Sequence, residues 1–203
     1  GGSSGWRIAA VAACAAAMCA KSVAVTAPLL VFLYDRAFLS GSFREAWRRS
    51  RWMYAGLAAT WGVMAALLIA YPPVHKSAGF GVESVTPWQY ALAQPNVILH
   101  YLRLAFWPDA LCLDYDWPAA RGLRDALPGG IVIGALAAAT LWASWRAPRA
   151  GFLGLWFFGV LGPTSSFMPI LDVCFEHRMY LPLAAVTAGA AIGAWELARR
   201  PAG

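Results

Sequence analysis

Ionisable side chains are few in this sequence, and one group of them combines acid, imidazole and guanidinium: Asp172, Glu176, His177 and Arg178. A guanidinium fork matches the oxygens of a phosphate, and a carboxylate or an imidazole can move a proton during a reaction. The segment therefore predicts a phosphate or acid–base site. An ordinary surface loop, in which Glu176 pairs with Arg178, is an equally good interpretation.

Three further cationic or titratable residues stand in or beside apolar sequence. Lys21 interrupts a long apolar block, where its ammonium could bind a lipid phosphate as a point charge. A lysine at a helix end that extends to the headgroups is the simpler interpretation. His100 and Arg103 are three residues apart and so share one face of a predicted helix. A role in substrate binding and plain headgroup contact both stay open for this pair.

A fourth group consists of Asp109, Asp114 and Asp116. Carboxylates at positions 114 and 116 could hold a divalent cation with water completing the shell, or act on an acceptor. A capped turn is the commoner role for Asp beside Pro. The sequence has no phosphate-binding glycine loop, nucleophile elbow or zinc-protease motif, so we predict no cofactor and no confident metal site. Cys112 and Cys174 could form a disulfide, but the sequence does not fix a pairing.

The composition is that of a membrane protein. Hydrophobic residues make up 60% of the 203 residues, charged residues 13%, and the mean hydropathy is +0.55. A soluble domain has roughly 25% charged residues, so this chain has too few to cover a water-facing surface. We expect an all-α fold, a polytopic bundle of transmembrane helices in one membrane domain, residues 1–203. The net charge of +6 is explained by arginines at a membrane surface rather than by nucleic-acid binding.

About five or six segments are long and apolar enough to cross a bilayer, which takes about 20 residues. A break at Lys21 divides the first apolar block into two helices, although one long tilted helix is an alternative. The expected segments are residues 6–20, 22–39, 52–71, 129–145, 151–167 and 181–197.

Residues 86–107 predict a helix of a different kind. Thr86 suits the N-cap and Pro87 the first turn, and the Gln94–Pro95 step predicts a kink. The segment is too apolar for water, but a full crossing would break the alternation of charge described next. We therefore expect an interfacial or re-entrant helix on the outer side.

Arginines orient the predicted spans. They gather in residues 35–51, 146–150 and 199–200, which we expect on the cytoplasmic side, whereas 72–128 and 168–180 have mixed charge and should face outward. Arg44, Arg48 and Arg51 follow one side of a short amphipathic helix that would lie on anionic headgroups. Every chemical group described above then falls on the outer side.

Several strings resemble a known family, the transmembrane and tetratricopeptide-repeat O-mannosyltransferases and their bacterial relatives. The specific strings include Tyr-Leu-Arg-Leu and Glu-His-Arg-Met-Tyr-Leu-Pro, and the resemblance extends in order over nearly the whole chain. The matching segments are residues 19–29, 94–108, 111–118, 165–170 and 175–182.

The resemblance implies a GT-C type glycosyltransferase, which moves a sugar from a polyprenyl-phosphate carrier to a protein or glycan acceptor on the outer side. By analogy, Lys21, Arg103 and Arg178, together with His100, would bind the lipid phosphate. Glu176 and His177 would be the catalytic groups. The expected location is a bacterial inner membrane with the active side facing the periplasm.

The chain departs from the family at three places. The family's principal catalytic acid lies in a first outer loop upstream of this sequence, its Lys-Glu pair is Lys21-Ser22 here, and its tetratricopeptide repeats would follow residue 203. We therefore expect a fragment of a longer protein that is inactive alone. A non-catalytic membrane anchor or scaffold for a repeat domain is the first alternative. A transporter is the second, and it is disfavoured because no predicted span has an ionisable residue near its middle.

Overall fold

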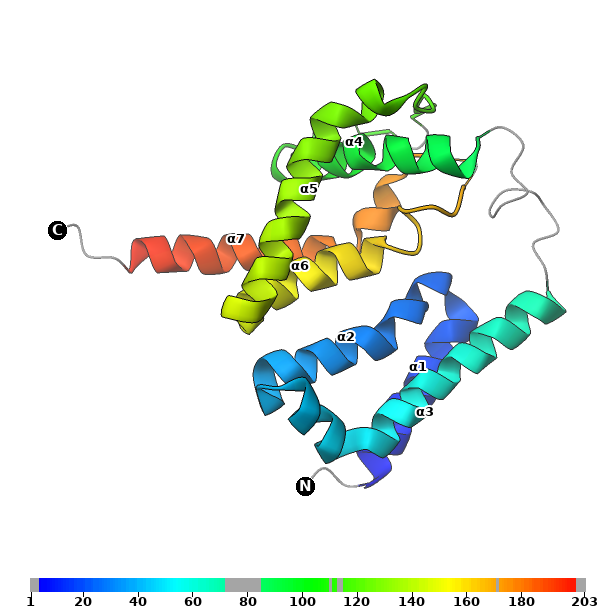
Figure 1. Cartoon of the computed structure of the whole chain (residues 1–203), viewed down its shortest axis with the longest axis vertical. Helices are drawn as coiled ribbons and strands as arrows, with labels where there is room; N and C mark the ends of the chain where they lie inside the picture. Colours follow the sequence, from blue (N-terminus) through cyan, green and yellow to red (C-terminus); the bar gives the residue numbers. More distant parts are fainter. Residues whose placement is uncertain (1–3, 72–84, 110, 113–114, 171, 200–203) are drawn as a thin grey trace. The chain divides into compact units, whose positions relative to one another are not determined.

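The computed structural model of this chain describes residues 4–71, 85–109, 111–112, 115–170 and 172–199. Within these ranges the chain is helical and contains no β-strand, which confirms the all-α prediction at that level. The chain divides into two compact units, Gly1–Lys76 and Ser77–Gly203, and each unit has its own buried core (Figure 1).

The N-terminal unit is built on two long helices that pack against each other. Its core consists of Cys14 and Met18 from one helix with Tyr54 and Leu57 from the other. The contact is close, since a side chain at Gly56 would meet Val11 at 2.9 Å. In order, the elements are α1 (Ser4–Ala20), the 3-10 helix η1 (Ser22–Thr26), α2 (Ala27–Tyr34), the π-helix η2 (Asp35–Ser40) and α3 (Phe43–Ala70).

The predicted break at Lys21 is confirmed. Lys21 is extended, with φ −155° and ψ 136°, and it lies between the end of α1 and the start of η1. The tight η1 turn leaves a backbone carbonyl at Val25 that accepts a hydrogen bond from the Trp61 indole N–H at 2.9 Å. A side chain of α3 thus supplies a partner that a continuous α-helix would have supplied itself.

A sharp corner joins η2 to α3. Gly41 has φ +72°, a conformation that glycine adopts without steric cost, and Ser42 caps α3 by accepting from the Glu45 N–H at 3.2 Å. Asp35 is buried nearby, at 6% exposure, and its carboxylate accepts hydrogen bonds from Ser40 and Tyr54. These two donors satisfy a charge that would otherwise be costly to bury.

Helix α3 is not straight. It has 28 residues, but Ser50 has non-helical dihedrals, with φ −142° and ψ 31°. The kink separates a first segment, Phe43–Arg49, from about 20 residues that follow it, roughly the length needed to cross a hydrocarbon core. The predicted amphipathic helix and the predicted span 52–71 are therefore two arms of one helix.

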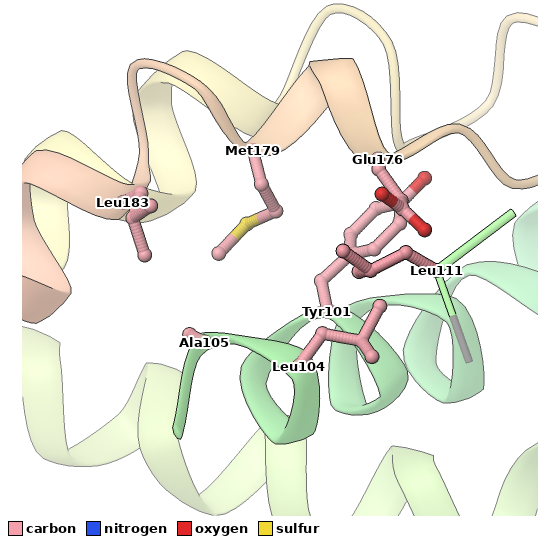
Figure 2. A pocket seen from close by; sticks show the side chains of 7 residues that line it. All are labelled: Tyr101, Leu104, Ala105, Leu111, Glu176, Met179 and Leu183. Carbon is pink, nitrogen blue, oxygen red and sulfur yellow. The ribbon is translucent and has the colours of Figure 1, made fainter. Parts of the chain in front are cut away.

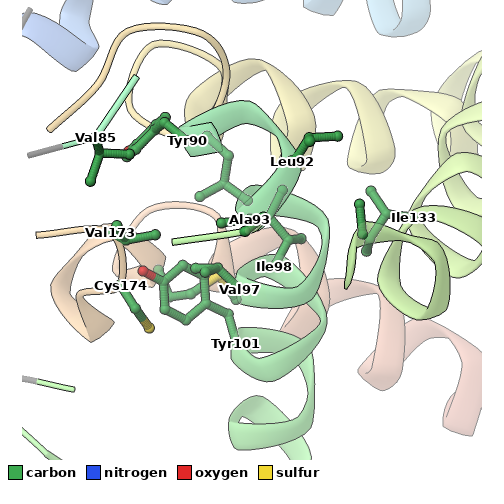
Figure 3. Close-up of a cluster of buried hydrophobic side chains, with 14 of the residues drawn as sticks. Val85, Tyr90, Leu92, Ala93, Val97, Ile98, Tyr101, Ile133, Val173 and Cys174 are labelled. Carbon is green, nitrogen blue, oxygen red and sulfur yellow. The ribbon is translucent and has the colours of Figure 1, made fainter. Parts of the chain in front are cut away.

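The C-terminal unit packs helices in chain order around one core. Its elements are α4 (Pro87–Phe106), α5 (Leu123–Arg146), α6 (Pro148–Leu161), the 3-10 helix η3 (Glu176–Met179) and α7 (Leu183–Ala198). Helix α4 packs on α5, α5 on α6 and α6 on α7, and α5 crosses α6 in Figure 1. The core of this unit lies along one face of α4, where the side chains of Tyr90, Val97 and Tyr101 are at most 1% exposed (Figure 3).

Helix α4 begins as predicted, and it contains Pro95. Thr86 and Gln89 form a capping box, since each side chain accepts from the backbone N–H of the other residue. The helix continues through Pro95 to Phe106 as one element, and the kink at the Gln94–Pro95 step stays a prediction. Thr86, Pro87 and the helix bounds are therefore confirmed, within one residue at each end.

The Asn96 side chain of α4 supplies hydrogen-bond partners to two backbone groups of α5. Pro128 lies inside α5 and disturbs its local hydrogen-bond ladder. The Asn96 amide accepts from the Gly129 N–H at 2.9 Å and donates to the Asp125 carbonyl at 2.5 Å. One side chain thus occupies the place of a helical hydrogen bond, and it joins α4 to the first turns of α5.

Three described helical segments have the length and hydropathy to cross a membrane. They are Ser22–Ser40, Phe43–Ala70 and Leu123–Arg146. Helices α1, α6 and α7 are apolar but shorter, with 17, 14 and 16 residues. The chain therefore has the character of a membrane protein, and the span count of five or six stays a prediction.

Candidate functional site

Glu176 is the best-positioned of the predicted catalytic residues. It begins η3, and its carboxylate accepts hydrogen bonds from the Cys112 backbone N–H at 2.9 Å and from the Tyr115 hydroxyl at 2.5 Å. The preceding residue, Phe175, is fixed as well, since its N–H donates to the Tyr101 hydroxyl at 2.6 Å. Groups from α4 and from the segment after α4 therefore determine where this carboxylate lies.

The Glu176 carboxylate lines a small cavity in an otherwise apolar setting (Figure 2). The cavity has a volume of about 100 Å³, and Glu176 is the only ionisable carboxylate on its wall. Small-molecule sites usually have volumes of roughly 300 Å³ or more, so this cavity accommodates one end of a ligand rather than a whole one. The lining residues are Tyr101, Leu104, Ala105, Leu111, Glu176, Met179 and Leu183.

Two phenols near the carboxylate are held in the protonated state. Burial raises the pKa of Tyr101 above its ordinary value. Burial, followed by the hydrogen bond and the charge of Glu176, raises the pKa of Tyr115 to about 12. Tyr115 therefore stays a hydrogen-bond donor to Glu176 at every physiological pH, which stabilises the ionised carboxylate.

Arg178 lies two residues after Glu176, and its guanidinium group donates hydrogen bonds to other groups of the protein. One terminal nitrogen donates to the Tyr90 hydroxyl at 3.0 Å and the Val173 carbonyl at 3.1 Å, and the other donates to the Asp172 carbonyl at 2.6 Å. The Tyr90 hydroxyl in turn donates to the Thr164 carbonyl at 2.5 Å. This pattern makes Arg178 an anchor for the backbone around η3, and a separate phosphate contact by Arg178 stays a prediction.

Arg103 and His100 lie on α4 and line an open groove of about 550 Å³. Arg103 makes an ion pair with Asp109, and its Nη2 is 2.5 Å from both carboxylate oxygens. His100 contacts the rings of Tyr115 and Trp117, with centroids 5.0 and 5.2 Å away. Burial and the neighbouring Arg103 lower the pKa of His100, which favours the neutral imidazole.

The remaining predicted residues are Lys21, His177, Asp114 and Asp116. Lys21 is exposed in the N-terminal unit, so a phosphate site shared with Arg178 stays a prediction. His177 is exposed, with its ring 5.0 Å from that of Phe175. Asp114 lies outside the described residues. Asp116 has φ +41°, a conformation consistent with the turn interpretation.

Three tyrosines of this site were not predicted from the sequence: Tyr90, Tyr101 and Tyr115. Tyr90 and Tyr101 are eleven residues apart, a spacing that places them on one helix face, but the same spacing is typical of an ordinary core. Tyr115 lies between Asp114 and Asp116, whose carboxylates suggested a metal site in the sequence. Cys112 and Cys174, considered as a disulfide, are not joined by one in the structure.

Comparisons of this chain with protein-family models, with curated proteins and with solved structures found no match.

Proposed function

We propose that this chain is the membrane portion of a glycosyltransferase that moves a sugar from a polyprenyl-phosphate carrier to an acceptor hydroxyl. The observation that carries the proposal is the position of Glu176, a carboxylate held by two donors on the wall of an apolar cavity. The resemblance of residues 94–118 and 165–182 to GT-C enzymes supplies the reaction class. The assignment of a GT-C fold to this chain is likewise part of this proposal.

In the proposed reaction, Glu176 orients the acceptor hydroxyl and takes up its proton. The acceptor oxygen forms a bond to the anomeric carbon, the bond from that carbon to the carrier phosphate breaks, and the sugar configuration inverts. Cationic residues stabilise the phosphate as it leaves. Lys21 and Arg103 are the exposed cations that the proposal assigns to this task, and Arg178 acts mainly by fixing η3.

The proposed setting is a bacterial inner membrane, with η3 and the cavity facing the periplasm. The support for membrane insertion is the three long apolar helical segments. The orientation rests on the arginines of residues 35–51, 146–150 and 199–200, which belong on the cytoplasmic side in this proposal.

A second candidate function, a non-catalytic anchor or scaffold, is favoured by a different observation. A scaffold predicts that outer charges are paired within the protein. Arg103 pairs with Asp109, and Arg178 is bonded to backbone carbonyls. The carboxylate of Glu176 distinguishes the two proposals, because a scaffold has no use for an acid on a cavity wall.

The test is the Glu176→Gln variant of the full-length protein in native membranes supplied with a polyprenyl-phosphate sugar. Glutamine keeps the size of the side chain but does not take up a proton, so sugar transfer should fall at least about 100-fold. Glu196→Gln on α7, an exposed position, is the matched control and should retain activity. Transfer by Glu176→Gln at the wild-type rate would exclude the assigned role, and absence of transfer by the wild type would favour the scaffold.

A further inference from the structure

The first arm of α3 and the residue directly after its kink form a strongly basic surface, which we call the arginine corner: Arg44, Arg48, Arg49 and Arg51. All four side chains are exposed. No carboxylate in the described part of the chain lies within salt-bridge distance of Arg44, Arg48 or Arg49. The only acid among residues 36–51 is Glu45, against five arginines, so this segment carries a net positive charge.

Aromatic packing fixes the orientation of this arm. Phe43 and Trp47 contact Phe32 of α2, with ring centroids 5.4 and 6.5 Å away, and Trp47 stacks on Tyr54 at 6.2 Å. Ala46, on the same side, is fully buried. Because the apolar side of the arm is packed against its own unit, the arginines at positions 44 and 48 project away from that side.

The position of the arm along the chain fixes its depth. It follows one segment that can cross a membrane, Ser22–Ser40, and it is the beginning of another, Phe43–Ala70. The kink at Ser50 leaves about 20 residues for the second crossing, so the arm before the kink lies outside the hydrocarbon core. Three exposed guanidinium groups, with Arg51 directly after the kink, are thus held where two predicted crossings meet the same membrane surface.

We propose that the arginine corner binds the phosphate groups of anionic phospholipids. Guanidinium groups match phosphate oxygens as paired donors, and unpaired basic groups beside a span are attracted to an anionic leaflet. The general tendency of arginine-rich loops to stay on the cytoplasmic side of a membrane does not require lipid binding. The proposed site differs because a helical arm holds its arginines at fixed spacing. The inference does not depend on the glycosyltransferase proposal.

The test compares matched double variants of the full chain purified in mild detergent. Native mass spectrometry measures retention of phosphatidylglycerol relative to phosphatidylcholine. Each arginine contributes about fivefold in preference for an anionic surface, so Arg44→Gln with Arg48→Gln should lower the preference about 30-fold. Arg121→Gln with Arg124→Gln removes the same charge from exposed positions before and in α5, and it should leave the preference near the wild-type value.

Two further measurements distinguish a bound phospholipid from a free phosphate ester. Raising the salt concentration from 50 to 500 mM should weaken the wild-type preference, and this measurement holds even if the double variant does not fold. Soluble glycerol phosphate at the same concentration should not displace phosphatidylglycerol. Equal retention by both double variants, a preference unaffected by salt, or displacement by glycerol phosphate would each overturn the proposal.

Discussion

At the scale of single residues, Glu176 and Tyr115 form the chemical centre of the C-terminal unit. The Glu176 carboxylate accepts a hydrogen bond from the Tyr115 hydroxyl, with 2.5 Å between the two oxygens. The Tyr115 ring also contacts the ring of His100. A carboxylate, a phenol and an imidazole thus come together from three separate segments of the chain, and Tyr115 and Glu176 are 61 residues apart. The phenol is the member whose ionisation can be followed directly.

Tyr115 should make the stability of the protein sensitive to alkaline pH. Its pKa in the folded state is about 12, above the ordinary value of 10.0, so the stabilisation is complete below pH 10 and is lost as the pH rises towards 12. Thermal unfolding in detergent should show this loss in the wild type and a smaller one in Tyr115→Phe. The control, Tyr71→Phe at an exposed position, should follow the wild type. Identical pH curves for Tyr115→Phe and wild type would contradict the hydrogen bond to Glu176.

Arg178 should behave as a structural anchor. Arg178→Lys loses the fork that reaches Tyr90, Val173 and Asp172 together, and leaves backbone carbonyls without their donor. We expect a loss of roughly 2–4 kcal/mol in the free energy of unfolding. Arg124→Lys, at an exposed position, should cost less than about 0.5 kcal/mol. The measurement is denaturant-induced unfolding in detergent, and equal stability of the two variants would show that Arg178 is free to bind a ligand instead.

At the scale of elements, the join between α4 and α5 depends on one amide. The Asn96 side chain bridges the Gly129 N–H and the Asp125 carbonyl, so it completes α5 near Pro128. Gly129 has no room for a side chain, because a Cβ there would lie 2.5 Å from the Asn96 amide oxygen. The glycine and the asparagine are therefore required together.

The variant Asn96→Leu should remove both bonds and lower the unfolding temperature. Two lost hydrogen bonds at a partly exposed site cost roughly 1–3 kcal/mol. Thr187→Ala on α7, whose hydroxyl bonds only within its own helix, is a control that should change stability by less than about 0.5 kcal/mol. Circular dichroism during heating measures both. If Asn96→Leu unfolds at the wild-type temperature, these two hydrogen bonds contribute nothing to stability.

Element boundaries were predictable where a local signal exists. Thr86, Pro87 and Gln89 begin a helix by capping chemistry within four residues, and Lys21 interrupts an apolar block. The merger of the arginine segment with the next span into one kinked helix was not predicted. Helical periodicity runs through both arms, and nothing in the sequence around Ser50 indicates a break.

The contacts of the site were not predictable from the sequence. Arg178 reaches Tyr90 across 88 residues and Tyr101 reaches Phe175 across 74. Periodicity indicates which face of a helix is buried, but it does not indicate which distant segment covers that face. The prediction that Arg178 and Glu176 pair with each other had the correct neighbourhood, but each residue bonds to other groups.

At the scale of the whole molecule, the orientation of the spans can be tested by labelling. In a variant without its four native cysteines, single cysteines at Ser42 and Arg149 should react with a membrane-impermeant maleimide only from the cytoplasmic side. A cysteine at the exposed Phe167 should react only from the other side. This pattern follows if α3, α5, α6 and α7 all cross. Reaction of Ser42 and Arg149 from opposite sides would mean that an odd number of crossings separates them.

The kink at Ser50 also defines a length, which has a consequence for the kind of bilayer that suits this chain. The second arm of α3 extends roughly 30 Å, since each of its residues rises about 1.5 Å. Because the aromatic residues of the first arm are packed against their own unit, the first arm does not lengthen the membrane-crossing arm. Thicker, sterol-rich bilayers of about 32–33 Å would therefore have to thin around this helix, whereas average bilayers match it without tilt. If the second arm of α3 crosses the membrane, we therefore expect this chain to favour bilayers of average thickness over thicker ones.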